Sequence, residues 1–111
     1  MMAIFQVFKS SNKNQYYYLL KATGNSQLIL SCEGFASKQS CLDGIKFIIA
    51  NAADENTFER KDSYLSYTFF AEDSTGNVIA KSENYTSIGP REQVIGLIQA
   101  DAPLATIQDL T

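Results

Sequence analysis

The sequence predicts an α+β fold in which one mainly antiparallel sheet carries two helices on one of its faces. The first observation behind this is an internal repeat. Seven of the 25 residues at 28–52 are identical to those 50 positions later, where average composition gives about one or two matches. The second observation is that strand-like runs precede an apolar stripe of 3.6-residue spacing in each copy. Two repeats, at about residues 3–53 and 54–111, are therefore expected to build a single domain.

Three strands are expected in the first repeat, at residues 3–9, 15–22 and 27–33. The middle strand alternates, so Tyr18 and Leu20 are expected on one face and Tyr17 and Leu19 on the other. A Gly-Asn pair at 24–25 predicts the following hairpin turn, because both residues tolerate positive φ.

The second repeat is expected to follow the same plan, with strands at residues 57–61, 65–72, 77–83 and a last strand at 105–109. Tyr67 and Phe69 match Tyr18 and Leu20 in pattern, and Asp62-Ser63 is the expected turn before them. The strand at 57–61 can serve as the first strand of the second repeat. The last strand can then close against the first repeat, which would exchange strands between the two halves.

Each repeat reaches a serine, Ser37 or Ser87, which is expected to cap the helix that follows. The expected helices lie at 38–51 and at about 89–100. Pro103 is expected to end the second helix, because proline cannot donate the backbone hydrogen bond that would continue it.

The composition argues against several classes of function. The chain has 111 residues, a net charge of −3, no histidine and no cluster of lysine and arginine. Nucleic-acid binding normally leaves a basic patch, so that partner is not expected. The absence of histidine removes the usual Ser/His and Cys/His catalytic pairs and the commonest metal ligand. Neither a catalytic residue, a cofactor nor a metal site is therefore predicted.

The N-terminus has no secretory signal pattern, and no apolar run is long enough to span a membrane. We therefore expect a cytoplasmic protein whose two cysteines, Cys32 and Cys41, are reduced thiols.

The order and spacing of the motifs resemble the YegP-like family, small tandem-repeat proteins built on domain of unknown function 1508. Shared features are an aromatic-x-Leu-Lys-Ala strand, a Gly/Asn turn, an I-x-x-S-E-x-Y-x-S junction and a helix that ends in Asn-Ala. The residues that carry the resemblance are Tyr18, Leu20, Lys21, Ala22, Ile29, Glu33, Phe35, Ser37, Ile45, Asn51 and Ala52, then Tyr67, Phe69, Ala71, Gly76, Ile79, Ser82, Glu83, Tyr85, Ser87, Ile95, Ala102, Pro103 and Asp109. The resemblance implies paired β(3)-α-β units that share one sheet and exchange their C-terminal strands. It implies no activity.

Two sets of residues are candidate sites. The carboxylates of Glu33 and Glu83 recur at the strand-to-helix junction and could meet near a pseudo-two-fold axis, or each could simply accept backbone bonds at its own junction. The second set is the sheet face that the helices are not expected to cover. Its predicted apolar residues are Tyr17, Leu19, Ile29, Phe70 and Ile79.

An uncovered apolar face usually marks an interface, so the favoured function is a non-catalytic interaction or accessory protein that binds a protein partner or itself. Two alternatives stay open. One is a small-molecule binding module on the same face. The other is an enzyme that would have to use the Glu33 and Glu83 pair.

Overall fold

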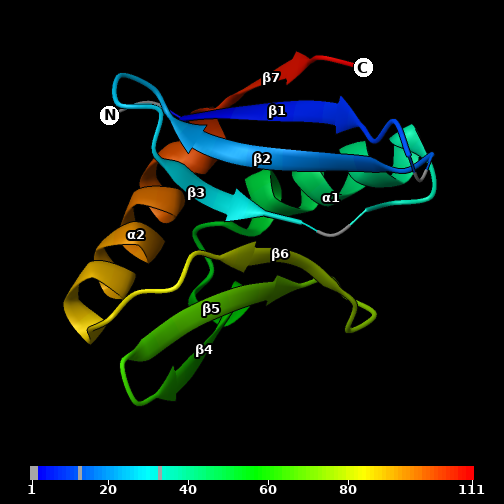
Figure 1. Cartoon of the computed structure of the whole chain (residues 1–111). Coiled ribbons are helices and arrows are strands. Elements are labelled where there is room, and N and C mark those ends of the chain that lie inside the picture. Colours follow the sequence, from blue (N-terminus) through cyan, green and yellow to red (C-terminus); the bar gives the residue numbers. More distant parts are fainter. Residues whose placement is uncertain (1–2, 13, 33) are drawn as a thin grey trace.

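The seven strands of this protein form one sheet in the order β4-β5-β6-β3-β2-β1-β7 (Figure 1). The coordinates are a computed structural model, which describes residues 3–12, 14–32 and 34–111. The strands are β1 Ala3–Lys9, β2 Tyr16–Ala22, β3 Leu28–Ser31, β4 Phe58–Ser63, β5 Ser66–Glu72, β6 Val78–Ser82 and β7 Thr106–Asp109. Neighbouring strands pair antiparallel except β1 and β7, which are parallel. The predicted α+β class with a mostly antiparallel sheet is confirmed.

Two long helices, α1 Lys38–Asn51 and α2 Ile88–Asp101, pack on one face of the sheet. Short 3-10 helices, η1 Glu55–Thr57 and η2 Ala102–Leu104, follow them and were not predicted. Gly44 of α1 brings its backbone against the rings of Tyr18 and Phe35, where a Cβ would lie 3.2 Å from the Phe35 ring. The buried core fills the space between the helices and the inner side of the sheet.

The two serines at the helix starts behave differently. The Ser37 hydroxyl accepts a hydrogen bond from the Ser40 backbone N–H, so it caps α1 as predicted. Ser87 has the same extended backbone conformation, but its side chain makes no capping hydrogen bond to α2. The prediction of a second serine cap is therefore wrong in its chemistry, although the helix begins at the predicted place.

A β-bulge in each half places an isoleucine in the core. Leu20 pairs with Leu30, but the next residue of β2 pairs with Leu28, which leaves Ile29 as the extra residue. The same shift between β5 and β6 leaves Ile79 unpaired. Because a bulge breaks the two-residue alternation, both isoleucines turn inward, and they are 1% and 4% exposed. The prediction that Ile29 and Ile79 lie on the uncovered sheet face is therefore wrong.

Backbone pairing shows which residues correspond between the N-terminal half (residues 3–53) and the C-terminal half (54–111). Isolated bridges join Tyr16 to Phe35 and Tyr67 to Tyr85, so Tyr67 corresponds to Tyr16. By the same register Phe69 corresponds to Tyr18, which shifts the sequence match predicted for these strands by two residues. The shift arises because the second hairpin is one residue shorter between its paired positions.

The turn between β4 and β5 also differs from the prediction. β4 continues through the expected turn residues Asp62 and Ser63, which pair with Tyr67 and Ser66. The turn lies instead at Tyr64 and Leu65, and Leu65 adopts a φ of 55°. Paired backbone and the contacts of Asp62 with α2 keep this segment extended, although aspartate and serine favour turns in isolation.

The last strand, β7, lies beside β1 at one edge of the sheet (Figure 1). Leu110 continues the pairing by donating its N–H to the Val7 carbonyl, and Lys38 of α1 forms an ion pair with Asp109. At the opposite edge, β4 pairs with β5, and its next five residues after Phe58 are exposed. The two edges of the sheet are thus finished differently.

Candidate functional site

The face of the sheet turned away from the helices, called here the open sheet face, carries the predicted apolar residues that remain outside the core. Tyr17 and Leu19 project from β2 and Phe70 from β5, and all three are half-buried. The Tyr17 ring stacks on Phe8, with 5.2 Å between ring centroids. Because α1 and α2 pack on the other side, this face gives the described part of the chain a surface of rings and aliphatic groups that can bind.

Lysines lie around the rings of the open sheet face. Lys61 of β4 holds its ammonium group 5.6 Å from the centroid of the Phe70 ring, an electrostatically favourable position. Lys81 pairs directly opposite Phe70, and Lys21 opposite Ile4. Glu59 and Glu72 lie on the same face, so its charge is mixed.

The predicted polar junction is described on one side only. Glu33 lies outside the described residues, and the distance between the two predicted carboxylates is therefore not part of the structure. Glu83 is exposed, and its backbone carbonyl accepts a hydrogen bond from the Ser82 hydroxyl. Burial, and then the negative charge of Glu83, raise the pKa of the Tyr85 phenol above its usual value.

The residues before the junction complete the sheet. The Ser82 hydroxyl accepts a hydrogen bond from the Phe69 backbone N–H at 3.0 Å, and the Cys32 sulfur accepts one from the Tyr18 N–H at 3.1 Å. The two side chains thus have the same structural task in the two halves. Cys41 is completely buried, and desolvation raises the pKa of its thiol to about 12. A thiol held neutral in this way is a poor nucleophile, so Cys41 is a core residue.

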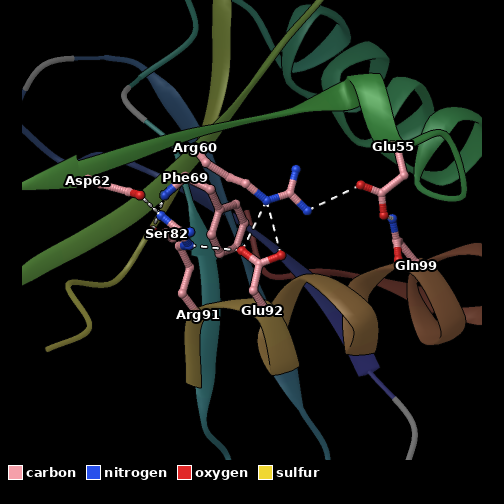
Figure 2. A network of polar contacts seen from close by, with 8 residues as sticks. All are labelled: Glu55, Arg60, Asp62, Phe69, Ser82, Arg91, Glu92 and Gln99. Atoms are coloured by element: carbon pink, nitrogen blue, oxygen red, sulfur yellow. Dashed lines mark hydrogen bonds and ion pairs between the residues drawn. The ribbon is translucent and has the colours of Figure 1, made fainter. Parts of the chain in front are cut away.

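A network of charged side chains lies between β4 and α2, and the sequence did not predict it (Figure 2). Arg91, only 4% exposed, donates to Glu92 at 2.9 Å and forms an ion pair with Asp62. Its guanidinium carbon lies 5.6 Å from the centroid of the Tyr67 ring. Burial of this cation is thus offset by two carboxylates and by a ring face.

Arg60 extends the same network toward the C-terminal end of α2 (Figure 2). Its Nε donates to both carboxylate oxygens of Glu92, at 3.1 and 3.0 Å, and its Nη2 donates to Glu55 at 3.2 Å. Gln99 donates to the other oxygen of Glu55 at 3.0 Å. The hydrogen bond from Arg60 lowers the pKa of Glu92, and the bond from Gln99 followed by the charge of Arg60 lowers that of Glu55.

This network is a structural clasp, because every charge in it that is mentioned above has a partner and no side chain of it is left to attack or bind a substrate. A weak signal was present in the sequence. At the internal offset of 50, Arg91 and Glu92 replace Cys41 and Leu42, so charge appears where the first helix has apolar residues. The sequence did not show that Arg60 and Asp62 would face that helix.

Within the described residues, no three side chains of the types Cys, His, Asp and Glu come together as a possible metal site. None of the described helices is both long and apolar enough to cross a bilayer. The chemistry that the described surface supports is non-covalent binding on the open sheet face.

Comparison with known proteins places this chain among proteins of unknown function. Residues 11–59 match the family described as domain of unknown function DUF1508. A UPF0339 protein from Bordetella pertussis is 33% identical over 111 residues, which cover 99% of this chain and 98% of the relative. The UPF0339 protein YegP of Escherichia coli K12 is 32% identical over 108 residues, 96% of each chain.

Solved structures show the same fold. The solution NMR structure of a UPF0339 protein from Shewanella oneidensis superposes with a TM-score of 0.91 at 28% identity, covering 100% of this chain and 93% of that one. The solution NMR structure of Escherichia coli YegP, titled a protein of unknown function, gives a TM-score of 0.90 at 31% identity and covers 100% and 95%.

Proposed function

This chain belongs to the UPF0339 family of YegP-like proteins, a family of unknown function, and we propose that it is a non-catalytic interaction protein that binds a second copy of itself through the open sheet face. The observation that carries the proposal is the cluster of half-buried apolar side chains on the N-terminal half of this face. Its members are Ile4, Phe8, Tyr17 and Leu19.

A second copy suits this face better than a strongly acidic or basic partner. The face carries Lys21, Lys61 and Lys81 together with Glu59 and Glu72, so neither sign dominates. In a two-fold contact the same patch lies on both copies, and lysines of one copy can lie near glutamates of the other. Aromatic residues are enriched in the cores of such interfaces.

Sedimentation velocity over a concentration series from about 10 μM to 1 mM tests the proposal. We expect a monomer–dimer equilibrium that the double substitution Tyr17→Ser with Leu19→Ser weakens by about tenfold or more, which corresponds to about 1.4 kcal/mol. Leu104→Ser is the matched control, because Leu104 is 75% exposed but lies on η2, away from the open sheet face. A strict monomer at 1 mM, or equal weakening by the control, would contradict the proposal.

We further propose that the two halves are tandem repeats that exchange a strand, in one domain spanning the chain. Corresponding bridges, at Tyr16–Phe35 and Tyr67–Tyr85, support the repeat. The parallel pairing of β7 with β1 supports the exchange, because β7 follows the helix of the C-terminal half.

We also propose the cytoplasm as the compartment. The free thiols of Cys32 and Cys41 support a reducing environment.

A further inference from the structure

The C-terminal half of the open sheet face is hollowed into a groove of about 270 Å³. Its floor is Phe70 of β5, and its sides come from the two neighbouring strands. Lys61 of β4 pairs opposite Thr68, and Lys81 of β6 pairs opposite Phe70. The groove is lined by Lys61, Thr68, Phe69, Phe70, Val78, Lys81 and Ser82.

The groove offers positive charge beside an apolar surface. Both lysines are exposed, and the described part of the chain places no carboxylate within ion-pair distance of Lys61. No acidic side chain lines the groove among the described residues. Val78, 49% exposed, and the Phe70 ring supply the apolar part, while the Thr68 hydroxyl can donate a hydrogen bond.

The N-terminal half lacks this combination. Phe8 stands at the position that corresponds to Lys61, and Tyr17 at that of Thr68, and these two rings stack on each other. Replacing a stacked pair of rings by a lysine and a small hydroxyl opens space and adds a cation. The groove is therefore a property of the C-terminal half and not of the fold as such.

We propose that this groove binds a small aromatic anion, with its ring on Phe70 and Val78 and its anionic group between the ammonium groups of Lys61 and Lys81. Cationic groups beside an apolar ring recognise a carboxylate or phosphate that is attached to an aryl group. Two lysines in a chain of net charge −3 are too few for the phosphate backbone of a nucleic acid. This site is separate from the apolar cluster that we propose for self-association.

Phenyl phosphate is the probe, followed by the ¹H–¹⁵N amide shifts of the full chain, with inorganic phosphate and benzyl alcohol as comparison probes. We expect saturable shifts that centre on β4, β5 and β6, and weaker binding of both comparison probes. Lys61→Gln is expected to weaken phenyl phosphate by about three- to fivefold, as for other exposed charge pairs. Phe70→Leu is expected to weaken it by a similar factor through loss of the ring contact.

Lys46→Gln is the matched control, because Lys46 is exposed on α1, on the other side of the sheet. Unchanged amide spectra outside the groove show that each variant is folded. The proposal is overturned if phenyl phosphate gives no saturable shifts at 10 mM, if inorganic phosphate binds equally well, or if Lys46→Gln weakens binding as much as Lys61→Gln. Shifts of the same amides by a short single-stranded RNA, without a response to phenyl phosphate, would also overturn it.

Dimer formation does not enter this test. The shifts are measured at about 50 μM, and sedimentation under the same conditions reports the oligomeric state separately. Loss of anion binding with intact self-association, or the reverse, therefore distinguishes the two proposals.

Discussion

The two halves of the sheet use the same ring geometry but surround it with opposite chemistry. Phe5 meets Tyr18 edge-to-face at 5.8 Å, and Phe58 meets Phe69 edge-to-face at the same distance. In the N-terminal half the neighbouring positions, Val7 and Cys41, are completely buried apolar residues. In the C-terminal half they are Arg60 and Arg91, held in an ionic network. The same backbone pairing thus accepts an apolar or an ionic interior.

The halves also deliver a cation to the same ring by different routes. Lys9 of β1 lies over Tyr16, 5.7 Å from its centroid, and its counterpart in β4 by pairing is Asp62. The ring that corresponds to Tyr16, Tyr67, instead receives Arg91 from the helix. Reversal of the charge on the strand is matched by a cation on α2, so the contact with the ring is kept. Four perturbations sharpen this comparison, from the largest expected effect to the smallest.

Arg91→Ala is expected to destabilise the protein by about 2–3 kcal/mol in urea unfolding. It removes a buried side chain and leaves Asp62 and Glu92 without their shared cation. The two carboxylates are partly exposed, which keeps the cost below that of a fully buried pair. Cys41→Ala, at the matching position of α1, is expected to cost about 1 kcal/mol. Equal costs for the two variants would show that the ionic interior contributes nothing special.

Tyr18→Phe is expected to cost about 1–2 kcal/mol, because the buried Tyr18 hydroxyl donates to the Ile79 carbonyl at 2.7 Å. Ile79 is the bulged residue of β6, so without this bond its carbonyl would lose a partner from the other half of the chain. Tyr64→Phe, at a position 91% exposed, is the control and should stay within about 0.5 kcal/mol. A cost for Tyr18→Phe no larger than that of the control would show that the bond between the halves adds no stability.

Ser37→Ala is expected to cost about 1 kcal/mol, whereas Ser87→Ala should cost a few tenths of that at most. The reason is that only the Ser37 hydroxyl accepts a hydrogen bond from the first turn of its helix. The pair of variants is its own control, since both serines have extended backbone at corresponding positions. Equal destabilisation by the two substitutions would contradict this difference between the helix starts.

The smallest effect concerns pH. The pKa of Glu92 is lowered in the folded state, so the carboxylate contributes stability above its unfolded pKa of about 4.3 and loses it as pH falls through the folded value. Glu92→Gln should therefore reduce the loss of stability between pH 6 and pH 3, by about 0.5 kcal/mol at most because the side chain is 39% exposed. Glu59→Gln, outside the network, is the control. An unchanged pH profile for Glu92→Gln would remove this contribution.

Much of the fold could be predicted from local patterns. The helix α1 and the strand β1 begin and end at the predicted residues, and the other strands lie within two residues of their predicted bounds. These elements are encoded by spacing and capping within a few neighbouring residues. The candidate surface was predicted in part, because Tyr17, Leu19 and Phe70 follow the simple alternation of a strand.

Partners far apart in the sequence decided the rest. The inward turn of Ile29 and Ile79 depends on bulges, which follow from how two strands align and not from either strand alone. The network of Arg60 and Arg91 forms because α2 crosses over β4, which brings together charges about thirty residues apart. The amino-acid sequence by itself determined which segments become strands and helices, and the repeat that orders them. Only the tertiary structure decided which charges find partners in the interior and which rings remain on the open sheet face, because both depend on distances that local sequence does not set.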